Sequence, residues 1–362
     1  MTTIIEIDGS QGEGGGQILR TALSLSMITG KPFRLTHIRA GRKKPGLMRQ
    51  HLVCVQAAQR ISNATVTGDE LHSQSLYFAP QAIQAGHYDF NIGTAGSTVL
   101  VLQTLLPALM LQDQPSQISI QGGTHNPMAP TAEFVALCFL PTLQKMGIQV
   151  DFVLEQAGFF PIGGGKISAT IHPWQNRQYL NLTERGPVQT INAHAAVLNL
   201  PDDIATRELA VLTQQFAPTR CQQAYLTGIS QGNTAYVLIN SEQHRQLFSV
   251  LGEMRKSAER VAHDLARQVK NYLNTHAVVD EYLADQLLLP LALGKGGEFT
   301  AQVISEHTRT QAAMIQRFLD CDIVLPATVF LPDSISLPAP DNGQHDGSFN
   351  LDYSLIKVRL SR

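Results

Sequence analysis

The sequence is poor in cysteine, and its cysteines are scattered. The 362 residues include four of them, at positions 54, 138, 221 and 321, with no CxxC pair. This spacing argues against the common zinc sites and against a disulfide framework. A few isolated cysteines are typical of a reducing compartment, so the sequence predicts a cytoplasmic protein.

Long apolar runs and targeting signals are also missing. The best candidate for a membrane span, Val99–Leu111, is interrupted by Gln103 and Pro107 and is too short to cross a bilayer. The first residues, MTTIIEIDG, lack the basic and apolar regions of a signal peptide. We therefore expect no association with a membrane.

Charged residues make up only 15% of the chain, and their distribution is uneven. No acidic residue lies between Glu13 and Asp69, whereas the 55 residues between them contain nine Lys or Arg. The rest of the chain has 18 basic residues (27 minus 9) against 29 acidic ones. A local positive field on an acidic chain favours a focused anion site over a broad nucleic-acid surface. A solvated basic face is the alternative.

Apolar segments and glycine turns alternate in an order that recurs along the chain. Residues 3–80 read as strand, helix, strand, helix, strand, strand, and residues 88–173 repeat this order. We predict an α/β (α+β) fold of repeated β-α-β-α-β-β units of roughly 90 residues. A change of pattern at residues 183–187 predicts a small inserted α/β domain over 184–276, while 1–183 and 277–362 form the large domain.

The same pattern predicts four individual segments. Residues 33–41 predict a strand, and apolar residues at 3–4 spacing predict a long helix over Glu253–Leu273. Residues 325–350 are rich in Pro, Asp, Asn and Gly and predict a loop. A last strand is expected over 353–360.

The segment GSQGEGGGQILR, residues 9–20, places five glycines before a predicted helix. It matches neither a P-loop nor GxGxxG, because Gln17 takes the last glycine position. Such a turn still lets backbone N–H groups face an anion, although a tight strand–helix turn is the alternative. Glu13 suits this site if a divalent cation lies between its carboxylate and a polyphosphate, since magnesium commonly has one or two carboxylate ligands besides phosphate oxygens.

A second basic segment, HIRAGRKKPGLMRQH, covers residues 37–51. Arg39 and Arg42 follow a predicted strand, and Gln50 and His51 begin a predicted helix. Arginine forks match phosphate oxygens in bidentate fashion. Beside the glycine segment, a phosphate site is a better interpretation than an isolated surface loop.

Two downstream segments offer further polar groups. Asp285 and Gln286 in EYLADQ stand before an apolar helix, where they serve either as an N-cap or in recognition of a ribose or base. His307 lies between a predicted strand and a predicted helix, where loop residues often act. The chain contains 12 histidines, so a single one is a weak signal by itself.

Taken together, these segments resemble the RNA 3′-terminal phosphate cyclases, and most of all the bacterial enzymes. The matching stretches run in order from about residue 3 to 322: DGSQGEGGGQILR, IRAGRKKPGLMRQH, LVLQTLLPAL, GGTHNPMAP, GFFPIGGGK, EYLADQLLLPLAL, and GEFT followed by a histidine. The resemblance implies units like the C-terminal domain of translation initiation factor three, with the small domain inserted before the last unit.

The resemblance also implies a reaction. The family's enzymes are ligases that convert an RNA 3′-terminal phosphate to a 2′,3′-cyclic phosphodiester while ATP is consumed and AMP and pyrophosphate are released. His307 matches their nucleophile, which forms a covalent histidine–AMP intermediate before an RNA-adenylate. The expected partners are ATP and RNA with a 3′-terminal phosphate, and a homodimer is a candidate assembly.

Further site residues follow from the same resemblance. Glu13 is expected to hold Mg2+ or Mn2+. The expected phosphate-binding residues are Arg20, Arg39, Arg42, Gln50 and His51. The expected ATP-binding residues are Gln103, Pro130, Tyr282, Leu283, Ala284, Asp285 and Gln286.

Three other interpretations compete with this one. A catalytically inactive, cyclase-like RNA-processing scaffold would share the fold, but its members lack the nucleophilic histidine that His307 matches. An enolpyruvyl transferase would lack the series EYLADQ, GEFT and a following histidine. A simple RNA-binding module would be broadly basic, unlike this chain.

Overall fold

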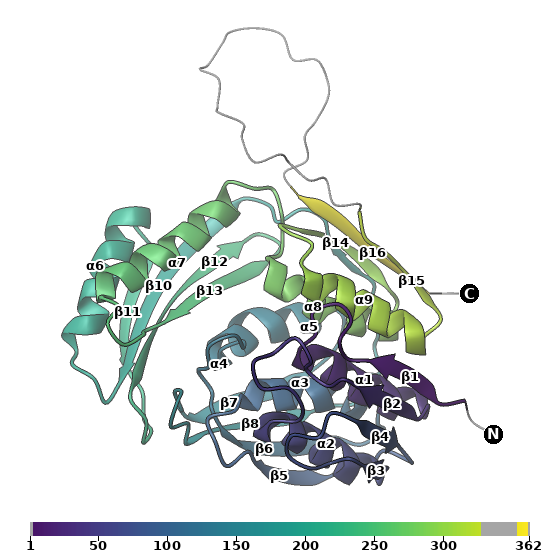
Figure 1. Cartoon of the computed structure of the whole chain (residues 1–362). Coiled ribbons are helices and arrows are strands. Elements are labelled where there is room, and N and C mark those ends of the chain that lie inside the picture. The colour runs from purple at the N-terminus through teal and green to yellow at the C-terminus, as the bar shows by residue number, and fades with distance from the viewer. Residues whose placement is uncertain (1–2, 327–352, 361–362) are drawn as a thin grey trace, which may run out of the picture.

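The computed structural model describes residues 3–326 and 353–360, so the predicted loop over 325–350 lies almost entirely outside the described residues. Within the described part, the strands form four sheets of four strands each, with helices packed against them (Figure 1). No helix in these ranges is both long enough and apolar enough to span a membrane.

The first unit follows the predicted order. It comprises β1 (Ile5–Asp8), α1 (Gly16–Thr29), β2 (Phe33–Thr36), α2 (Arg49–Ser62), β3 (Thr65–Thr67) and β4 (Leu76–Ala79). The sheet order is β1-β2-β4-β3, and only β1 and β2 run parallel. Phe33 and Leu35 alternate with exposed or half-buried residues along β2, which buries one face of the sheet.

The second unit repeats this topology. Its elements are β5 (His87–Asn91), α3 (Thr98–Leu109), β6 (Ser116–Gly122), a helical run of α4 (Ala132–Phe134), the π-helical turn η1 (Val135–Phe139) and α5 (Leu140–Gln144), then β7 (Val150–Gln156) and β8 (Gly165–Ile171). The order β5-β6-β8-β7 matches that of the first sheet strand for strand. The predicted recurrence of one β-α-β-α-β-β unit is therefore confirmed.

A third unit has the same topology, but its strands are far apart in the sequence. It consists of β9 (Leu180–Leu182), α8 (Glu281–Leu293), β14 (Gly297–Ala301), α9 (Glu306–Phe318), β15 (Cys321–Val324) and β16 (Ser354–Leu360), in the order β9-β14-β16-β15. The expected last strand is thus present as β16. The expectation that the insertion precedes the last unit needs a correction, because β9 pairs in parallel with β14 and is that unit's first strand.

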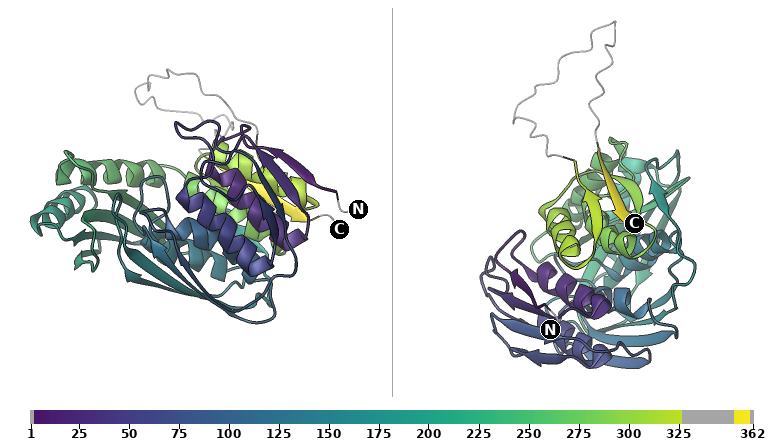
Figure 2. Two further views of the ribbon diagram at one scale, coloured as in Figure 1. Left: turned by 60° about the horizontal axis from the view of Figure 1, so that its bottom comes forward. Right: turned by 90° about the vertical axis from the view of Figure 1, so that its right-hand side faces the viewer.

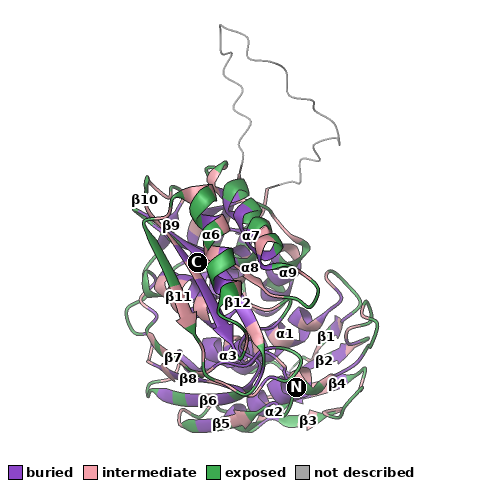
Figure 3. Cartoon of the chain, turned by 90° about the vertical axis from the view of Figure 1, so that its left-hand side faces the viewer, coloured by how far each residue is buried: buried purple, intermediate pink, exposed green. Residues whose placement is uncertain are grey.

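The inserted segment, residues 188–273, has its own sheet and core. It contains β10 (Val188–Leu198), α6 (Asp203–Phe216), β11 (Arg220–Tyr225), β12 (Gly232–Ser241), β13 (Arg245–Leu251) and α7 (Ala258–Leu273). The sheet order is β11-β10-β12-β13, with α6 and α7 against one face and β11 exposed at an edge (Figure 3). The predicted helix start at Glu253 is wrong by five residues, because Ser257 caps α7 by accepting the Arg260 N–H.

The helices of the three units share one core. Buried side chains from α1, α2, α3, α8 and α9 belong to a single apolar cluster, and α1 packs directly against both α3 and α9. In both views of Figure 2, the yellow-green helices of the third unit lie beside the purple helices of the first. This packing brings the start of α1 next to the start of α9.

Candidate active site

The glycine segment between β1 and α1 is docked on the third unit. Gly12 and Gly14 have φ values of 57° and 61°, in the left-handed region that favours glycine. The backbone N–H of Glu13 donates to the Thr310 hydroxyl of α9 over 3.1 Å. A Cβ at Gly12 would collide with that same hydroxyl. The loop conformation therefore depends on a contact across nearly 300 residues of chain.

The carboxylate of Glu13 is buried, with its side chain only 8% exposed. Its Oε1 accepts a hydrogen bond from Nη2 of Arg42, while its Oε2 has no hydrogen-bond partner among the described residues. Within residues 3–326 and 353–360, no group of three or more His, Cys, Asp and Glu could hold a metal ion. A cation at Glu13 would therefore take most of its ligands from a bound substrate or water.

Basic side chains from three elements meet at the start of α1. A Cβ at Gly16 would lie 2.5 Å from Nε2 of His51 and 2.7 Å from Nη1 of Arg20, and one at Gly15 would lie 2.7 Å from Nη2 of Arg42. Glycine at these positions leaves room for the three side chains. The N-cap of α1, Gly15, provides no side-chain cap, so the first N–H groups of the helix face the same place.

The charges of this cluster are only partly balanced. Burial, together with Arg20, Arg39 and Arg42, lowers the pKa of His51 to about 3, so His51 is neutral. Burial and the neighbouring Arg20 also lower the pKa of Arg39. Like charges held together in a partly buried place attract an anion, as the sequence predicts.

Two of the predicted phosphate-binding residues also have local roles. Arg39 donates from Nη1 to the backbone carbonyls of Lys44 and Gly46, at 2.7 and 3.0 Å. The backbone leaves the extended conformation at His37, whose φ is 50°, so β2 stops at Thr36 rather than at residue 41 as predicted. Gln50 accepts the Ser97 N–H through Oε1 at 2.7 Å, which ties α2 to the start of α3.

His307 is the second residue of α9 rather than a loop residue, and Ser305 is the N-cap. Its Nδ1 lies 3.0 Å from Oε1 of Gln17 on α1. Burial and the positive charges of Arg20 and Arg42 lower the pKa of His307. The imidazole is therefore held neutral, which is the state in which a ring nitrogen has a free lone pair.

Gln17 also reaches a third helix. Its Nε2 donates to Oδ2 of Asp285 on α8 over 2.7 Å, so α1, α8 and α9 are joined through one amide. In the sequence, Gln17 stands out only as a departure from a glycine motif. Its position at the start of α1 is the only signal in the sequence, because both partners lie more than 260 residues away.

The N-cap interpretation of Asp285 is wrong. Asp285 lies inside α8, and the cap is Asp280, whose Oδ1 accepts the Leu283 N–H at 2.8 Å. Burial and the nearby charge of Asp280 raise the pKa of Asp285 to about 7. The segment DEYLADQ, residues 280–286, has three carboxylates near a helix start, and only the contacts tell which one is the cap.

The residues expected to bind ATP are divided between the surface and the core. Gln103 donates to Oε1 of Gln286 over 2.6 Å, and Gln286 donates to the Tyr282 carbonyl over 2.5 Å. The Tyr282 side chain is exposed. Leu283 and Ala284 are both fully buried, so their side chains do not face the surface, and Pro130 is half-buried in the loop between β6 and α4.

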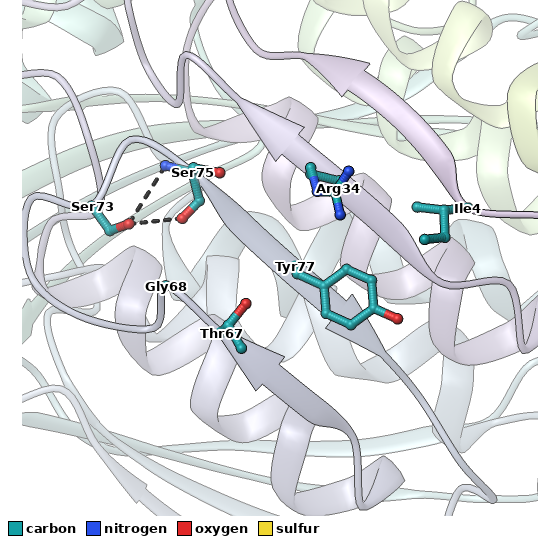
Figure 4. A pocket seen from close by; sticks show the side chains of 7 residues that line it. All are labelled: Ile4, Arg34, Thr67, Gly68, Ser73, Ser75 and Tyr77. Atoms are coloured by element: carbon teal, nitrogen blue, oxygen red, sulfur yellow. Dashed lines mark hydrogen bonds between the residues drawn. The ribbon is translucent and has the colours of Figure 1, made fainter.

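A hollow elsewhere on the surface does not overlap this cluster. A shallow depression of about 540 Å³ lies on the outer face of the first sheet. Its lining includes Arg34, Thr67, Ser73 and Tyr77, which are drawn in Figure 4. Arg34 is paired there with Glu6 at 2.9 Å. None of the predicted site residues lines this depression.

The cluster at the start of α1 and α9 therefore has the parts of a nucleotidyl-transfer centre. It combines a neutral histidine, several cations for phosphate oxygens, backbone N–H groups at a helix start and a buried carboxylate with one free oxygen. Such a set suits attack of a ring nitrogen on an electrophilic phosphorus.

Comparisons with known proteins agree with this class. The family model for RNA 3′-terminal phosphate cyclase matches residues 11–325. The chain is similar to RNA 3′-terminal phosphate cyclases of Ralstonia nicotianae, with 48% identity over 89% of this chain and 94% of the relative, and of Koribacter versatilis, with 48% over 87% and 90%. The corresponding protein of Salmonella agona is 47% identical, over 88% of this chain and 93% of its own length.

The chain thus belongs to the RNA 3′-terminal phosphate cyclase family. The predicted family and the predicted class of enzyme are both confirmed, over a range close to that of the matching motifs.

Proposed function

We propose that this enzyme converts an RNA 3′-terminal phosphate to a 2′,3′-cyclic phosphodiester, using ATP and a covalent histidine–AMP intermediate. The observation that carries the mechanism is the position of His307, whose neutral ring lies beside Arg20 and Arg42 at a helix start. The name shared by the curated relatives supports the overall reaction.

The first step would place AMP on His307. One ring nitrogen attacks the α-phosphorus of ATP, a nitrogen–phosphorus bond forms, and the bond to the bridging β-phosphate oxygen breaks. Pyrophosphate leaves with that electron pair. The negative charge that grows on pyrophosphate is stabilised by arginines that are already in place before the reaction. A fixed positive charge lowers the barrier most where negative charge develops in the transition state.

Two further steps would complete the cycle. An oxygen of the RNA 3′-phosphate attacks the AMP phosphorus, and the nitrogen–phosphorus bond breaks to regenerate His307. The adjacent 2′-oxygen then attacks the RNA phosphorus, releases AMP and gives up its proton to solvent. Both groups of this last step belong to one ribose, so proximity provides much of the rate and a 2′-hydroxyl is required.

Divalent metal fits beside Glu13. The unpartnered, buried Oε2 of Glu13 is a hard oxygen ligand of the kind that Mg2+ or Mn2+ prefers. A single carboxylate suits an ion that takes its other ligands from a triphosphate. When bound, such an ion would neutralise phosphate charge, and Arg42 would then be released from Glu13 to contact phosphate.

The remaining residues are assigned by charge and position. Arg20, Arg39, Arg42, Gln50 and His51 would contact the phosphates of ATP or RNA. Gln103, Pro130 and the surface of α8 at Tyr282, Asp285 and Gln286 would contact the adenosine, while the buried Leu283 and Ala284 would support that surface from beneath.

Covalent labelling tests the proposal. The protein is incubated with magnesium and α-labelled ATP, denatured, and examined for acid-labile, alkali-stable label. We expect about one AMP per chain and none in His307→Ala. Label retained in that variant would exclude His307 as the nucleophile. Absence of label from the unmodified protein, with or without RNA 3′-phosphate, would favour the catalytically inactive scaffold.

Several other expectations stay predictions. They are the division into residues 1–183 with 277–362 and residues 184–276, the homodimer and the cytoplasmic location. Limited proteolysis tests the first, and gel filtration with light scattering tests the second.

A further inference from the structure

We propose that Gln17 is a positioning residue that holds His307 as a single tautomer, with the proton on Nδ1 and the lone pair on Nε2. The inference rests on the proposed function, because it concerns which nitrogen attacks ATP. It follows from the hydrogen bonds that join Asp285, Gln17 and His307 across three helices.

The orientation of the Gln17 amide is decided by Asp285. Above its raised pKa of about 7, the Asp285 carboxylate is ionised and only accepts hydrogen bonds, so there the amide nitrogen of Gln17 must face Oδ2 of Asp285, 2.7 Å away. The amide oxygen is then turned toward His307, 3.0 Å from Nδ1. An amide oxygen only accepts, so Nδ1 must carry the proton.

This assignment matters because a neutral imidazole exists as two tautomers with opposite reactivity at each nitrogen. The nitrogen with the proton has no lone pair in the ring plane and cannot attack phosphorus. A hydrogen bond at one nitrogen therefore selects the other as the nucleophile, as second partners do for metal-bound histidines.

The same bond would strengthen during the reaction. Attack by Nε2 leaves the ring with a proton on Nδ1 and a phosphorus on Nε2, so the ring gains positive charge. A hydrogen bond from a charged donor is stronger than one from a neutral donor. Gln17, with the carboxyl group of Asp285 behind it, would then stabilise the transition state more than the ground state.

The helix pair contains a second polar contact that provides a matched control. Four residues after Gln17, the hydroxyl of Thr21 on α1 donates to Oε1 of Gln311 on α9 over 2.6 Å. Gln311 lies four residues after His307, so the two contacts are successive bridges along the same helix–helix interface. Thr21→Val removes a buried hydrogen bond from this interface without touching His307.

The test uses the full chain with ¹⁵N-labelled histidine, and His307→Ala assigns the His307 signals. In the unmodified protein we expect a protonated Nδ1 and an unprotonated Nε2 in the long-range ¹H–¹⁵N spectrum. Gln17→Met removes the acceptor at similar volume and should give a tautomer mixture. Its rate of AMP transfer to the protein should fall about 10–100-fold, with little change in the affinity for ATP.

Gln17→Glu and Thr21→Val separate positioning from packing. In Gln17→Glu a carboxylate oxygen replaces the amide nitrogen that faces Asp285, so the two carboxyl groups must share one proton. The other glutamate oxygen still accepts the hydrogen bond from Nδ1 of His307, so the variant should retain the single tautomer and recover at least tenfold over Gln17→Met. Thr21→Val should lower stability but leave the His307 spectrum and the AMP-transfer rate within about twofold.

Two results would overturn the inference. One is a His307 tautomer that is the same in Gln17→Met and in the unmodified protein, and the other is equal loss of AMP transfer in Gln17→Met and Gln17→Glu. Failure of the unmodified protein to take up AMP would contradict the proposed function instead, and the tautomer readout on the free protein remains valid in that case.

Discussion

Replacing Asp280 by asparagine should stabilise the enzyme in a pH-dependent way. Asp280 is 3% exposed, and burial raises the pKa of its carboxyl group from 3.8 to about 7. Each tenfold change in proton affinity corresponds to about 1.4 kcal/mol, so ionising Asp280 costs the folded state about 4 kcal/mol. Asparagine caps helices as well as aspartate does, so the bond from the Leu283 N–H should persist.

The sign follows from proton binding. Between pH 3.8 and 7, the unfolded chain has released the Asp280 proton while the folded protein keeps it, so stability falls as pH rises. From pH 5 to pH 8 the unmodified protein should lose about 3 kcal/mol from this group alone. Asp280→Asn removes that loss. The difference in unfolding free energy between the variant and the unmodified protein should therefore be about 3 kcal/mol larger at pH 8 than at pH 5, in favour of the variant.

Chemical denaturation followed by circular dichroism at several pH values between 5 and 8 measures the difference. Asp202→Asn is the control, since Asp202 is the exposed N-cap of α6 and makes no side-chain cap bond. Its effect should stay within about 0.5 kcal/mol at every pH. A stability difference between Asp280→Asn and the unmodified protein that is the same at pH 5 and pH 8 would refute the reasoning.

Two further substitutions test the glycine segment. Glu13→Ala should weaken metal-dependent AMP transfer much more than RNA binding, measured by labelling and by filter binding, and equal loss of both would contradict the metal role. Gly12→Ala should destabilise the fold by about 1–2 kcal/mol from its backbone conformation alone, with an added loss from the collision with Thr310. Gly30→Ala is the control, because Gly30 has a similar φ of 68° and open space around it. Equal unfolding free energies for the two variants would show that the close approach of Thr310 to Gly12 does not affect stability.

Local patterns were sufficient for most of the elements. Apolar residues at helical spacing and glycine turns predicted that α1, α2 and α3 exist and where they stand in the order of elements, and the repeat of the β-α-β-α-β-β unit. These signals are short-range, because a helix or strand buries one face wherever its neighbours lie. The strands β9 and β11 were not predicted, since one has only three residues and the other is a mostly polar edge strand.

The chemistry of the candidate site was also readable in part. Glu13, Arg42, His51 and His307 were expected together, and the structure places them around the starts of α1 and α9. The charge pattern alone indicated an anion site near residues 39–51. Motifs distant in sequence were connected only by the resemblance to the family.

By itself, then, the sequence determined the repeated unit, the basic segment for which an anion site is predicted, and the family. Only the tertiary structure decided that the third unit begins with β9 ahead of the insertion, that Asp280 rather than Asp285 caps α8, and that Gln17 joins Asp285 to His307. The physical reason is the distance along the chain over which each kind of signal acts. Periodicity and turn residues act within a few positions, whereas hydrogen bonds between residues more than 260 positions apart exist only once three helices have packed into one core.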